Sequence, residues 1–168
     1  MSLYKQLFLA LILCFGLSAC QTLSSADITA QTQEQLDRID IKAADTRLQQ
    51  IFNRHLVDNL NQNAALRDLA LTTKLTATNS STLAVRGKSS TLSKTSMQLT
   101  YALSDRVSGG ALTSGTITAT ATSGTISSYY GQDKSKQFAA ERLTRQLADK
   151  LTLRLKRYFL EIDQEPNS

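Results

Sequence analysis

The chain has 168 residues, enough for one domain with a sizeable core, and it shows no internal repeat and no second domain. A formal net charge of +5 favours an anionic partner, and residues 69–160 have 13 basic and 4 acidic side chains, a local excess of nine positive charges. A single His and two Cys are too few for the Cys and His clusters that hold a structural zinc ion.

Residues 1–19 have the layout of a secretory signal peptide. Lys5 precedes an apolar run from Leu7 to Leu17, and small residues follow at Ser18 and Ala19. The run holds roughly half of the ~20 apolar residues that a membrane-spanning helix needs. We therefore expect this segment to be removed and to contribute nothing to the fold.

The end of the signal matches the lipobox of bacterial lipoproteins, Leu17-Ser18-Ala19-Cys20, in which the Cys thiol is diacylated and becomes the new N-terminus. Each buried methylene contributes about 0.8 kcal/mol, and two acyl chains hold a protein stably on a membrane. The alternative is an ordinary signal peptide followed by a coincidental Cys. Acylation of Cys20 would leave no thiol for other chemistry, because Cys14 lies in the discarded segment.

Gln21 follows the acylated position and is not the Asp that retains enteric lipoproteins in the inner membrane. We expect the protein on the outer membrane, lipid-anchored and facing the periplasm. The natural anionic partners there are lipid or lipopolysaccharide phosphates, and nucleic acid is not expected. Residues 20–35 are rich in Gln, Thr, Ser and Ala, which predicts a lipidated N-terminus with a flexible tether.

The first elements beyond the tether are a short strand and a helix. Ile39 and Ile41 alternate with polar neighbours, which indicates a strand. From about Thr46 to Asn61, apolar residues recur at spacings of three and four, which is typical of an amphipathic helix with Asp45 as its N-cap. The apolar positions are Leu48, Ile51, Phe52, Leu56 and Leu60.

The central region is predicted to form three strands, although it looks like low-complexity sequence. Of the 57 residues from Thr72 to Ser128, 26 are Ser or Thr. Apolar and polar residues nevertheless alternate over Leu69–Ala77, Met97–Leu103 and Leu112–Ile126, the pattern of half-buried strands with β-branched Thr outside. Gly109-Gly110 marks a hairpin. We expect an antiparallel meander with one core face and one Thr-rich face.

A helix from about Ser135 to Phe159 is the clearest element. Its apolar stripe consists of Ala140, Leu143, Leu147, Leu151, Leu155 and Tyr158. The order of elements predicts an α+β two-layer sandwich, with two helices packed on one face of a mostly antiparallel four-stranded sheet. A single domain should cover residues 36–160, followed by a polar tail at 161–168. Tyr129 and Tyr130 are expected to pack the first turn of the helix against the sheet, and contact with a partner protein is the alternative.

Residues with catalytic potential are scarce, and we predict no enzyme, no catalytic residue, no cofactor and no metal site. His55 has no second His to share a metal and is expected at the surface or its boundary. The sequence contains neither a G-x-S-x-G nucleophile motif nor a G-x-x-x-x-G-K-[ST] phosphate loop. Acidic residues are scattered singly. A periplasmic hydrolase is therefore only the third hypothesis.

Binding is the better hypothesis, and two basic sets could carry it. Arg86, Lys88 and Lys94 surround a predicted strand turn, with Arg106 in a nearby loop, where cations can meet a phosphate. A solvated rim without a dedicated ligand is the alternative. The second set flanks the final helix, where an ordinary solvated face is favoured. The uncharged Thr-rich face of the sheet suits a hydrogen-bonding protein contact.

Several stretches spread over most of the mature chain carry a resemblance to a known family. They are Leu17–Cys20, Ile39–Ile41, Arg47–Leu56, Ala84–Arg86, Ser90-Thr91, Tyr101–Asp105, Ser127–Gly131, Ala139–Leu143, Gln146–Lys150 and Arg154-Leu155. In these stretches the sequence resembles the LptE family of lipopolysaccharide-assembly lipoproteins, in the form found in alphaproteobacteria. It departs from that pattern after the acylated Cys, where Gln21–Ser25 replaces an aromatic, Pro-containing stretch.

The resemblance implies a non-enzymatic role, in which the domain sits as a plug inside the β-barrel partner LptD and helps that barrel assemble and insert lipopolysaccharide into the outer leaflet. The polar lumen of a barrel would suit the Thr-rich face. The first basic set, Arg86, Lys88, Lys94 and Arg106, then becomes a candidate for lipid A or core phosphates. The alternative is a lipoprotein scaffold or pilot for another envelope complex, such as a secretin, with no glycolipid contact.

Overall fold

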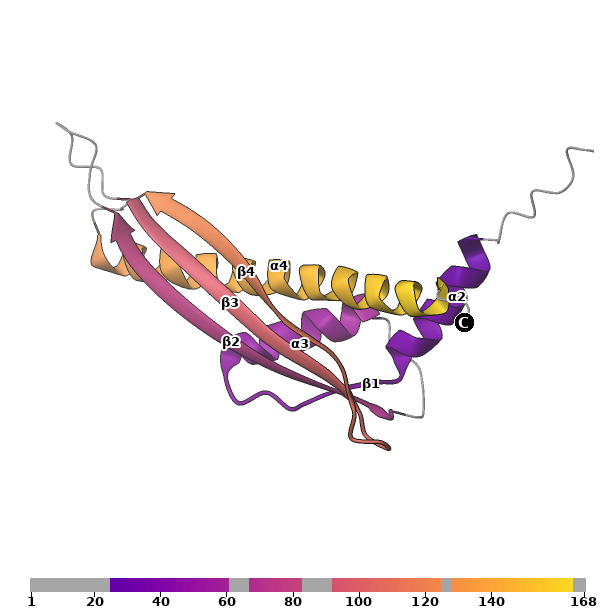
Figure 1. The fold of residues 1–168 in the computed structure, drawn as a ribbon. Coiled ribbons are helices and arrows are strands. Elements are labelled where there is room, and N and C mark those ends of the chain that lie inside the picture. The colour runs from indigo at the N-terminus through magenta and orange to yellow at the C-terminus, as the bar shows by residue number, and fades with distance from the viewer. Residues whose placement is uncertain (1–24, 61–66, 83–91, 125–127, 165–168) are drawn as a thin grey trace, which may run out of the picture. The chain divides into compact units, whose positions relative to one another are not determined.

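The computed structural model describes residues 25–60, 67–82, 92–124 and 128–164. Cys20 and the predicted signal peptide lie outside these residues. The chain divides into two compact units, residues 1–31 and 32–168, and the second contains the whole sheet (Figure 1). The elements are α2 (Ser25–Asp37), β1 (Ile39–Ile41), α3 (Arg47–Leu60), β2 (Leu69–Thr82), β3 (Leu92–Asp105), β4 (Ala111–Gly124) and α4 (Tyr129–Gln164).

The four strands form one sheet in the order β1-β2-β3-β4. The short β1 runs parallel to β2, whereas β2, β3 and β4 are antiparallel neighbours. In the middle of the sheet, Leu99 of β3 lies between Leu75 and Ile117. The predicted mostly antiparallel four-stranded sheet is confirmed, including the segments in which Ser and Thr dominate.

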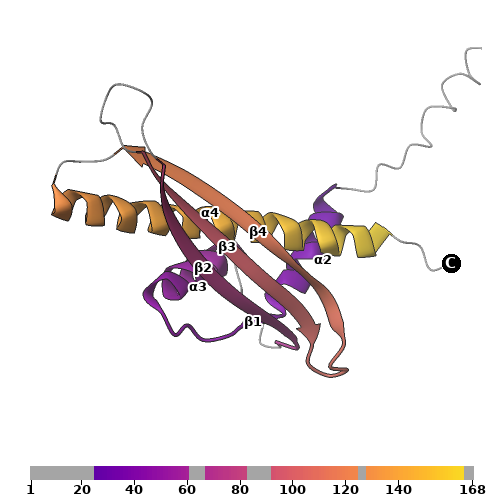
Figure 2. The same cartoon turned by 60° about the vertical axis from the view of Figure 1, so that its left-hand side comes forward.

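The helices cover one face of this sheet, as the alternation of the strands predicts. Odd-numbered side chains such as Leu71, Leu99 and Leu103 are buried, while their even-numbered neighbours point to the other side. Figures 1 and 2 show α3 and α4 on the same side of the strands. The α+β class is therefore confirmed, with the core between the sheet and the helices.

Each of the two long helices contributes a buried stripe. Phe52, Leu56 and Leu60 of α3 recur every four residues and are fully buried. Leu143, Leu147, Leu151, Leu155 and Phe159 of α4 do the same over a greater length. The backbone N–H of Gln49 donates to Thr46 Oγ1 at 3.2 Å, so Thr46 caps α3 and the prediction of Asp45 as the N-cap is wrong.

Helix α2 occupies residues where the sequence predicted a tether. Residues 25–35 of the predicted flexible segment are helical, and the helix continues to Asp37. Its C-terminal part is held by packing, because Thr32 and Leu36 are buried and Gln33 Nε2 donates to the Leu60 carbonyl at 2.5 Å. These contacts with residues distant in sequence stabilise a helix whose polar composition gives little signal of its own.

Helix α4 is longer than predicted at both ends. It begins at Tyr129 and continues to Gln164, so its last turn includes residues 161–164 of the predicted polar tail. Tyr130 is 71% exposed, and the prediction that it packs against the sheet is wrong. The Lys134 ammonium lies 5.7 Å from the centre of its ring, a cation–π contact at the surface.

The turn between β3 and β4 confirms the predicted Gly109-Gly110 hairpin. Gly109 has a φ of 68°, the left-handed region that a side chain disfavours. Asp105 organises the turn, because its carboxylate accepts from the backbone N–H of Val107 at 2.7 Å and its own N–H donates to Gly110 O at 2.9 Å. The turn thereby pins the long β3–β4 register from one end.

Candidate docking face and basic sites

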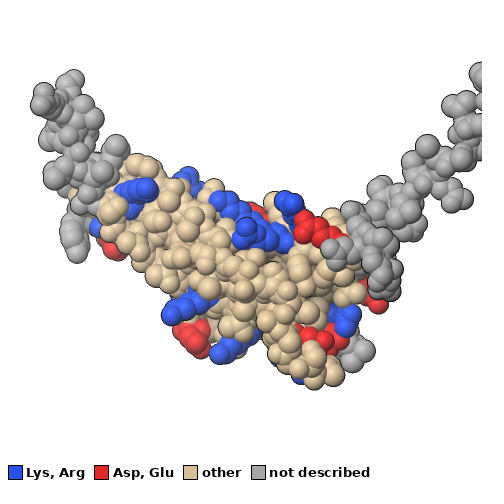
Figure 3. Space-filling view, in the orientation of Figure 1, with Lys and Arg blue, Asp and Glu red and all other residues tan. Residues whose placement is uncertain are grey.

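The side of the sheet away from the helices is a hydrogen-bonding surface with few charged side chains, which we call the polar face. Register places its residues in rows across three strands, such as Thr76, Gln98 and Thr118, or Thr78, Ser96 and Thr120. The described residues on it are Ala70, Thr72, Lys74, Thr76, Thr78, Ser80, Lys94, Ser96, Gln98, Thr100, Ala102, Ser104, Ser114, Thr116, Thr118, Thr120 and Thr122. In Figure 3 a broad band without charged side chains runs over the strands.

Folding alone does not require this composition. β-branched Thr is a good strand former, but solvated strand faces ordinarily carry many charged side chains as well. Within the described part of the polar face, the charged residues are Lys74 and Lys94 alone, and there is no carboxylate. Such a surface offers hydroxyl donors and acceptors whose desolvation costs less than that of ions, which suits contact with another polar protein surface.

The predicted phosphate set does not form one cluster. Lys94 is exposed near the start of β3, in register with Ser80 and Thr122, whereas Arg106 follows the last residue of the same strand. At about 3.3 Å per residue, the two are separated by roughly 40 Å along the strand. The prediction that Arg106 lies in a loop near Lys94 is therefore wrong. Arg86 and Lys88 lie outside the described residues.

Arg106 instead joins a group of ion pairs at the β1 end of the sheet. Its guanidinium pairs with the Asp40 carboxylate of β1, and its backbone N–H donates to Asp68 O at 2.8 Å. Next to it, Arg38 binds Asp68 with two nitrogens, and Arg38 Nε lies 2.9 Å from Asp68 Oδ1. These pairs connect α2, β1, β2 and the hairpin turn, so a structural role accounts for Arg106.

The Arg38–Asp68 pair perturbs both groups. The hydrogen bond from the Arg38 guanidinium lowers the pKa of the Asp68 carboxyl below its usual value. The same bond raises the pKa of Arg38, although partial burial acts in the opposite direction. Both side chains remain about one-third exposed, so solvent screens the pair and its contribution to stability is modest.

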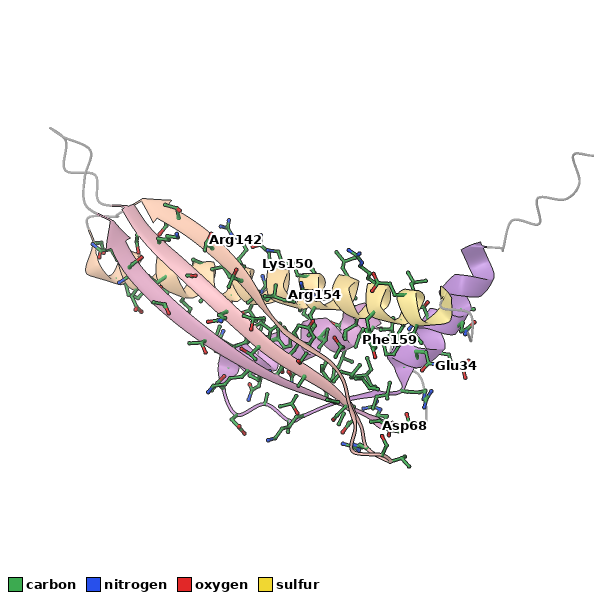
Figure 4. All side chains as sticks on the ribbon, viewed as in Figure 1. Glu34, Asp68, Arg142, Lys150, Arg154 and Phe159 are labelled. Carbon is green, nitrogen blue, oxygen red and sulfur yellow. The ribbon has the colours of Figure 1, made fainter. Side chains whose placement is uncertain are left out.

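Two cations and a tyrosine on one side of α4 have a structural role that the sequence did not reveal. Lys150 Nζ donates to Thr118 O at 3.1 Å, Arg154 to Thr116 O at 3.4 Å, and the Tyr158 hydroxyl to Leu112 O at 3.2 Å. These three residues recur every four positions on α4, and their acceptors belong to the open edge of β4. Figure 4 shows Lys150 and Arg154 on α4 beside this strand. They cap part of the edge, which protects it from pairing with other strands.

The fold on which these surfaces lie is shared with solved lipoproteins. A Caulobacter crescentus protein assigned as a lipoprotein superimposes with a TM-score of 0.61 at 18% identity, covering 77% of this chain and 96% of its own. A minor lipoprotein of Acinetobacter baumannii gives a TM-score of 0.51 at 17% identity, with coverages of 71% and 90%. The sequence matches no protein-family model and no curated protein. At these identities the likeness establishes the fold.

His55 lies at the boundary of the protein, as predicted. Its Nε2 is 2.9 Å from Asp149 Oδ1, and Asn59 Nδ2 donates to the same oxygen at 2.8 Å, so the three side chains link α3 to α4. Among the residues that the structure describes, no three His, Cys, Asp or Glu side chains are grouped to hold a metal ion. Within the same residues, no helix has the length and apolar character needed to cross a membrane.

Proposed function

We propose that this chain is a non-enzymatic outer-membrane lipoprotein, acylated at Cys20, whose domain plugs the β-barrel LptD and helps it insert lipopolysaccharide into the outer leaflet. The observation that carries the proposal is the polar face, a long three-stranded surface of Thr, Ser and Gln left uncovered by the helices. A barrel lumen is polar and can match such hydroxyls with its own donors and acceptors. The lipoprotein fold supports a lipid-anchored location.

Shape and chemistry favour this partner over a charged one. Each strand of the β2–β4 meander has 14 residues and so spans roughly 45 Å, about the height of a membrane with its headgroups. A charged partner surface would need counter-charges that the polar face provides only at Lys74 and Lys94. We therefore assign docking to the polar face and leave the ion pairs around Arg106 to folding.

Copurification tests the proposal. Affinity-tagged full chain, extracted in mild detergent, should bring down LptD in a stoichiometric amount. Thr76→Glu combined with Thr118→Glu, in one row of the polar face, should abolish this recovery because two carboxylates would be buried without partners. Val107→Glu is the matched control, since that side chain is 85% exposed in the hairpin turn, away from the polar face. Recovery of a secretin or a peptidoglycan-synthesis complex in place of LptD would end the plug proposal.

Lipid anchoring is tested separately. Cys20→Ala should remove the acylation site and release the protein into the periplasmic fraction, whereas the parent should cofractionate with outer membranes on a density gradient. A variant that stays on the outer membrane would show that another part of the chain holds it there.

Glycolipid contact is proposed at Lys94, which is exposed near the start of β3, and at Arg86 and Lys88, which lie outside the described residues. Arg86→Glu combined with Lys88→Glu should weaken lipopolysaccharide binding in a pull-down with labelled glycolipid, because charge reversal repels phosphate. Arg106→Gln is the control and should bind as the parent does, since Asp40 already occupies that guanidinium. Unchanged binding by the double variant would remove this site.

A further inference from the structure

The open edge of β4 is capped along only part of its length. Donors from α4 reach the carbonyls of Leu112, Thr116 and Thr118, which establishes that even-numbered residues of β4 direct their backbone polar groups away from β3. Because this direction alternates along a strand, the N–H and C=O groups of Thr120 and Thr122 point to the same open side. No side chain within the described residues donates to either carbonyl.

A groove begins where this capping stops. It has a volume of about 550 Å³ and lies between the end of β4, from Ala121 to Ser123, and the first turns of α4. Its surface is mainly apolar: Ala139 and the ring of Phe138 contribute to its helical wall. Phe138 is 67% exposed, whereas the other phenylalanine of the helix, Phe159, is almost completely buried.

The charges that line the groove all have one sign. Lys134 and Arg142 come from α4, and no Asp or Glu belongs to the lining. Arg142 is exposed and forms no ion pair within the described residues, in contrast to Arg38, Arg47 and Arg106. Figure 4 places Arg142 on α4 towards the start of the helix, ahead of Lys150. An occupant of this groove would therefore encounter a strand edge that has no paired strand among the described residues, an apolar wall and two cations.

We propose that an extended, acidic segment of a partner polypeptide adds to β4 at Thr120 and Thr122. Strand addition uses the free N–H and C=O groups for affinity, and alternate side chains of the added strand enter pockets on either side. Side chains on the helix side would pack against Phe138 and Ala139, while a carboxylate of the segment pairs with Arg142 or Lys134. This inference does not depend on which barrel or complex the polar face contacts.

The other edge of the sheet, along β2, can be compared with the β4 edge as a binding site for an added strand. β1 pairs only with residues 69–71 of β2, so the odd-numbered residues of β2 beyond Leu71 also direct backbone groups outward. The groove at that edge is smaller, about 220 Å³, and Asp45 lies in its lining beside Lys42 and Lys74. An acidic strand is therefore expected to prefer β4.

The test uses the full chain in detergent and fluorescent synthetic peptides of alternating Val and Thr that contain two Asp residues. Two such peptides are prepared, one with Asp at Val positions and one with Asp at Thr positions, so that the carboxylates lie on opposite faces of the strand. One of the two peptides should bind saturably by fluorescence anisotropy and shift the amide NMR signals of Thr120 and Thr122. A comparator with alternate backbone amides N-methylated on its pairing edge should lose binding, because it cannot donate to the carbonyls. A Lys-for-Asp peptide should bind about tenfold more weakly, the effect expected for losing a charge-assisted hydrogen bond.

Variants of the chain locate the site. Thr122→Pro removes one outward N–H without touching the ladder to β3, and it should abolish binding while leaving the circular dichroism spectrum and melting temperature near those of the parent. Ala77→Pro does the same at the free edge of β2 and should leave binding unchanged. Arg142→Glu should weaken binding about tenfold. Lys136→Glu, on the same helix but outside the groove lining, should have little effect.

Several results would overturn the proposal. Saturable binding of neither acidic peptide would do so, as would equal binding of the N-methylated comparator, since main-chain pairing would then be irrelevant. If Ala77→Pro lost binding while Thr122→Pro kept it, the site would lie at the other edge of the sheet, on β2. A self-associated parent, dissociated by Thr122→Pro, would identify a second copy as the occupant. Uptake of laurate that competes with the peptide and is lost in Arg142→Glu would identify the groove as a fatty-acid site.

Discussion

Replacing Leu151 by Ala should destabilise the domain far more than the same change at Leu153, two residues away on α4. The Leu151 side chain is fully buried between the helix and the sheet, whereas Leu153 is 67% exposed. Truncation of a fully buried Leu removes its transfer free energy and leaves a cavity, which together cost about 2.7–5 kcal/mol. An exposed substitution of the same chemistry stays within about 0.5 kcal/mol.

The expected difference in unfolding free energy is large enough to distinguish the two variants. A domain of this size loses about 2–4 °C of melting temperature for each kcal/mol, so Leu151→Ala should melt roughly 5–20 °C below the parent. Leu153→Ala should melt within about 2 °C of it. Urea denaturation followed by circular dichroism gives the same comparison as a free energy, with similar m-values if both variants expose the same surface on unfolding.

The comparison of Leu151→Ala with Leu153→Ala also tests which side of the sheet the helices leave uncovered. If α4 buries the stripe that contains Leu151 against the inner face of the strands, the polar face has no helical cover and is available to a partner. Equal losses for the two variants, or a greater loss for Leu153→Ala, would mean that α4 is rotated about its axis. The assignment of the polar face as a docking surface would then lose its basis.

Three further predictions concern single features of the fold. Asp68→Asn should lower the free energy of unfolding by at most about 1 kcal/mol at neutral pH. Because Arg38 lowers the pKa of Asp68, the stabilisation by this ion pair is present above the unfolded pKa of about 4 and vanishes as the pH falls through the folded pKa. The parent and the variant should therefore converge in urea titrations at acid pH. Lys150→Ala with Arg154→Ala should increase self-association in sedimentation velocity, since two edge carbonyls lose their caps; an unchanged sedimentation coefficient at high concentration would contradict this. Gly109→Ala should lower the free energy of unfolding by about 1 kcal/mol through its positive φ alone, because nothing lies within 4 Å of the added methyl group; no change in the urea midpoint would argue against that backbone conformation.

The strands could be predicted because their pattern is local. Alternation over Leu69–Ala77 or Met97–Leu103 survives a composition dominated by Thr, and one buried face follows directly from period two. The alternation ends at Ala77, yet β2 continues without interruption to Thr82. Pairing with β3 supplies the hydrogen bonds that this polar end requires, and such pairing is a property of two strands, which one strand's sequence does not reveal.

The features that were predicted wrongly from the sequence depend on contacts between segments that are distant in the chain. Helix α2 is ordered by burial of Thr32 and Leu36, and Leu36 is the one apolar residue within 31–37, which is a weak sequence signal for a buried helix. The position of Arg106 relative to Lys94 depends on strand length, because Lys94 lies near the start of β3 and Arg106 follows its last residue. Capping of β4 by Lys150 depends on the angle at which α4 crosses the sheet, so the sequence indicated the cation but not its acceptor.

In these proposals, two surfaces of the same sheet recognise partners by different chemistry. The polar face presents side-chain hydroxyls, so its contacts depend on residue identity at rows such as Thr76, Gln98 and Thr118. The uncapped edge at Thr120 and Thr122 presents backbone groups, whose recognition depends on strand geometry, while the cations of the groove favour an acidic strand. Side-chain charge on the polar face and proline at the edge should consequently act independently: Thr76→Glu with Thr118→Glu should release LptD while retaining the acidic peptide, and Thr122→Pro should do the reverse. If either change removed both partners, the two surfaces would be a single interface and the separate assignments would fail together.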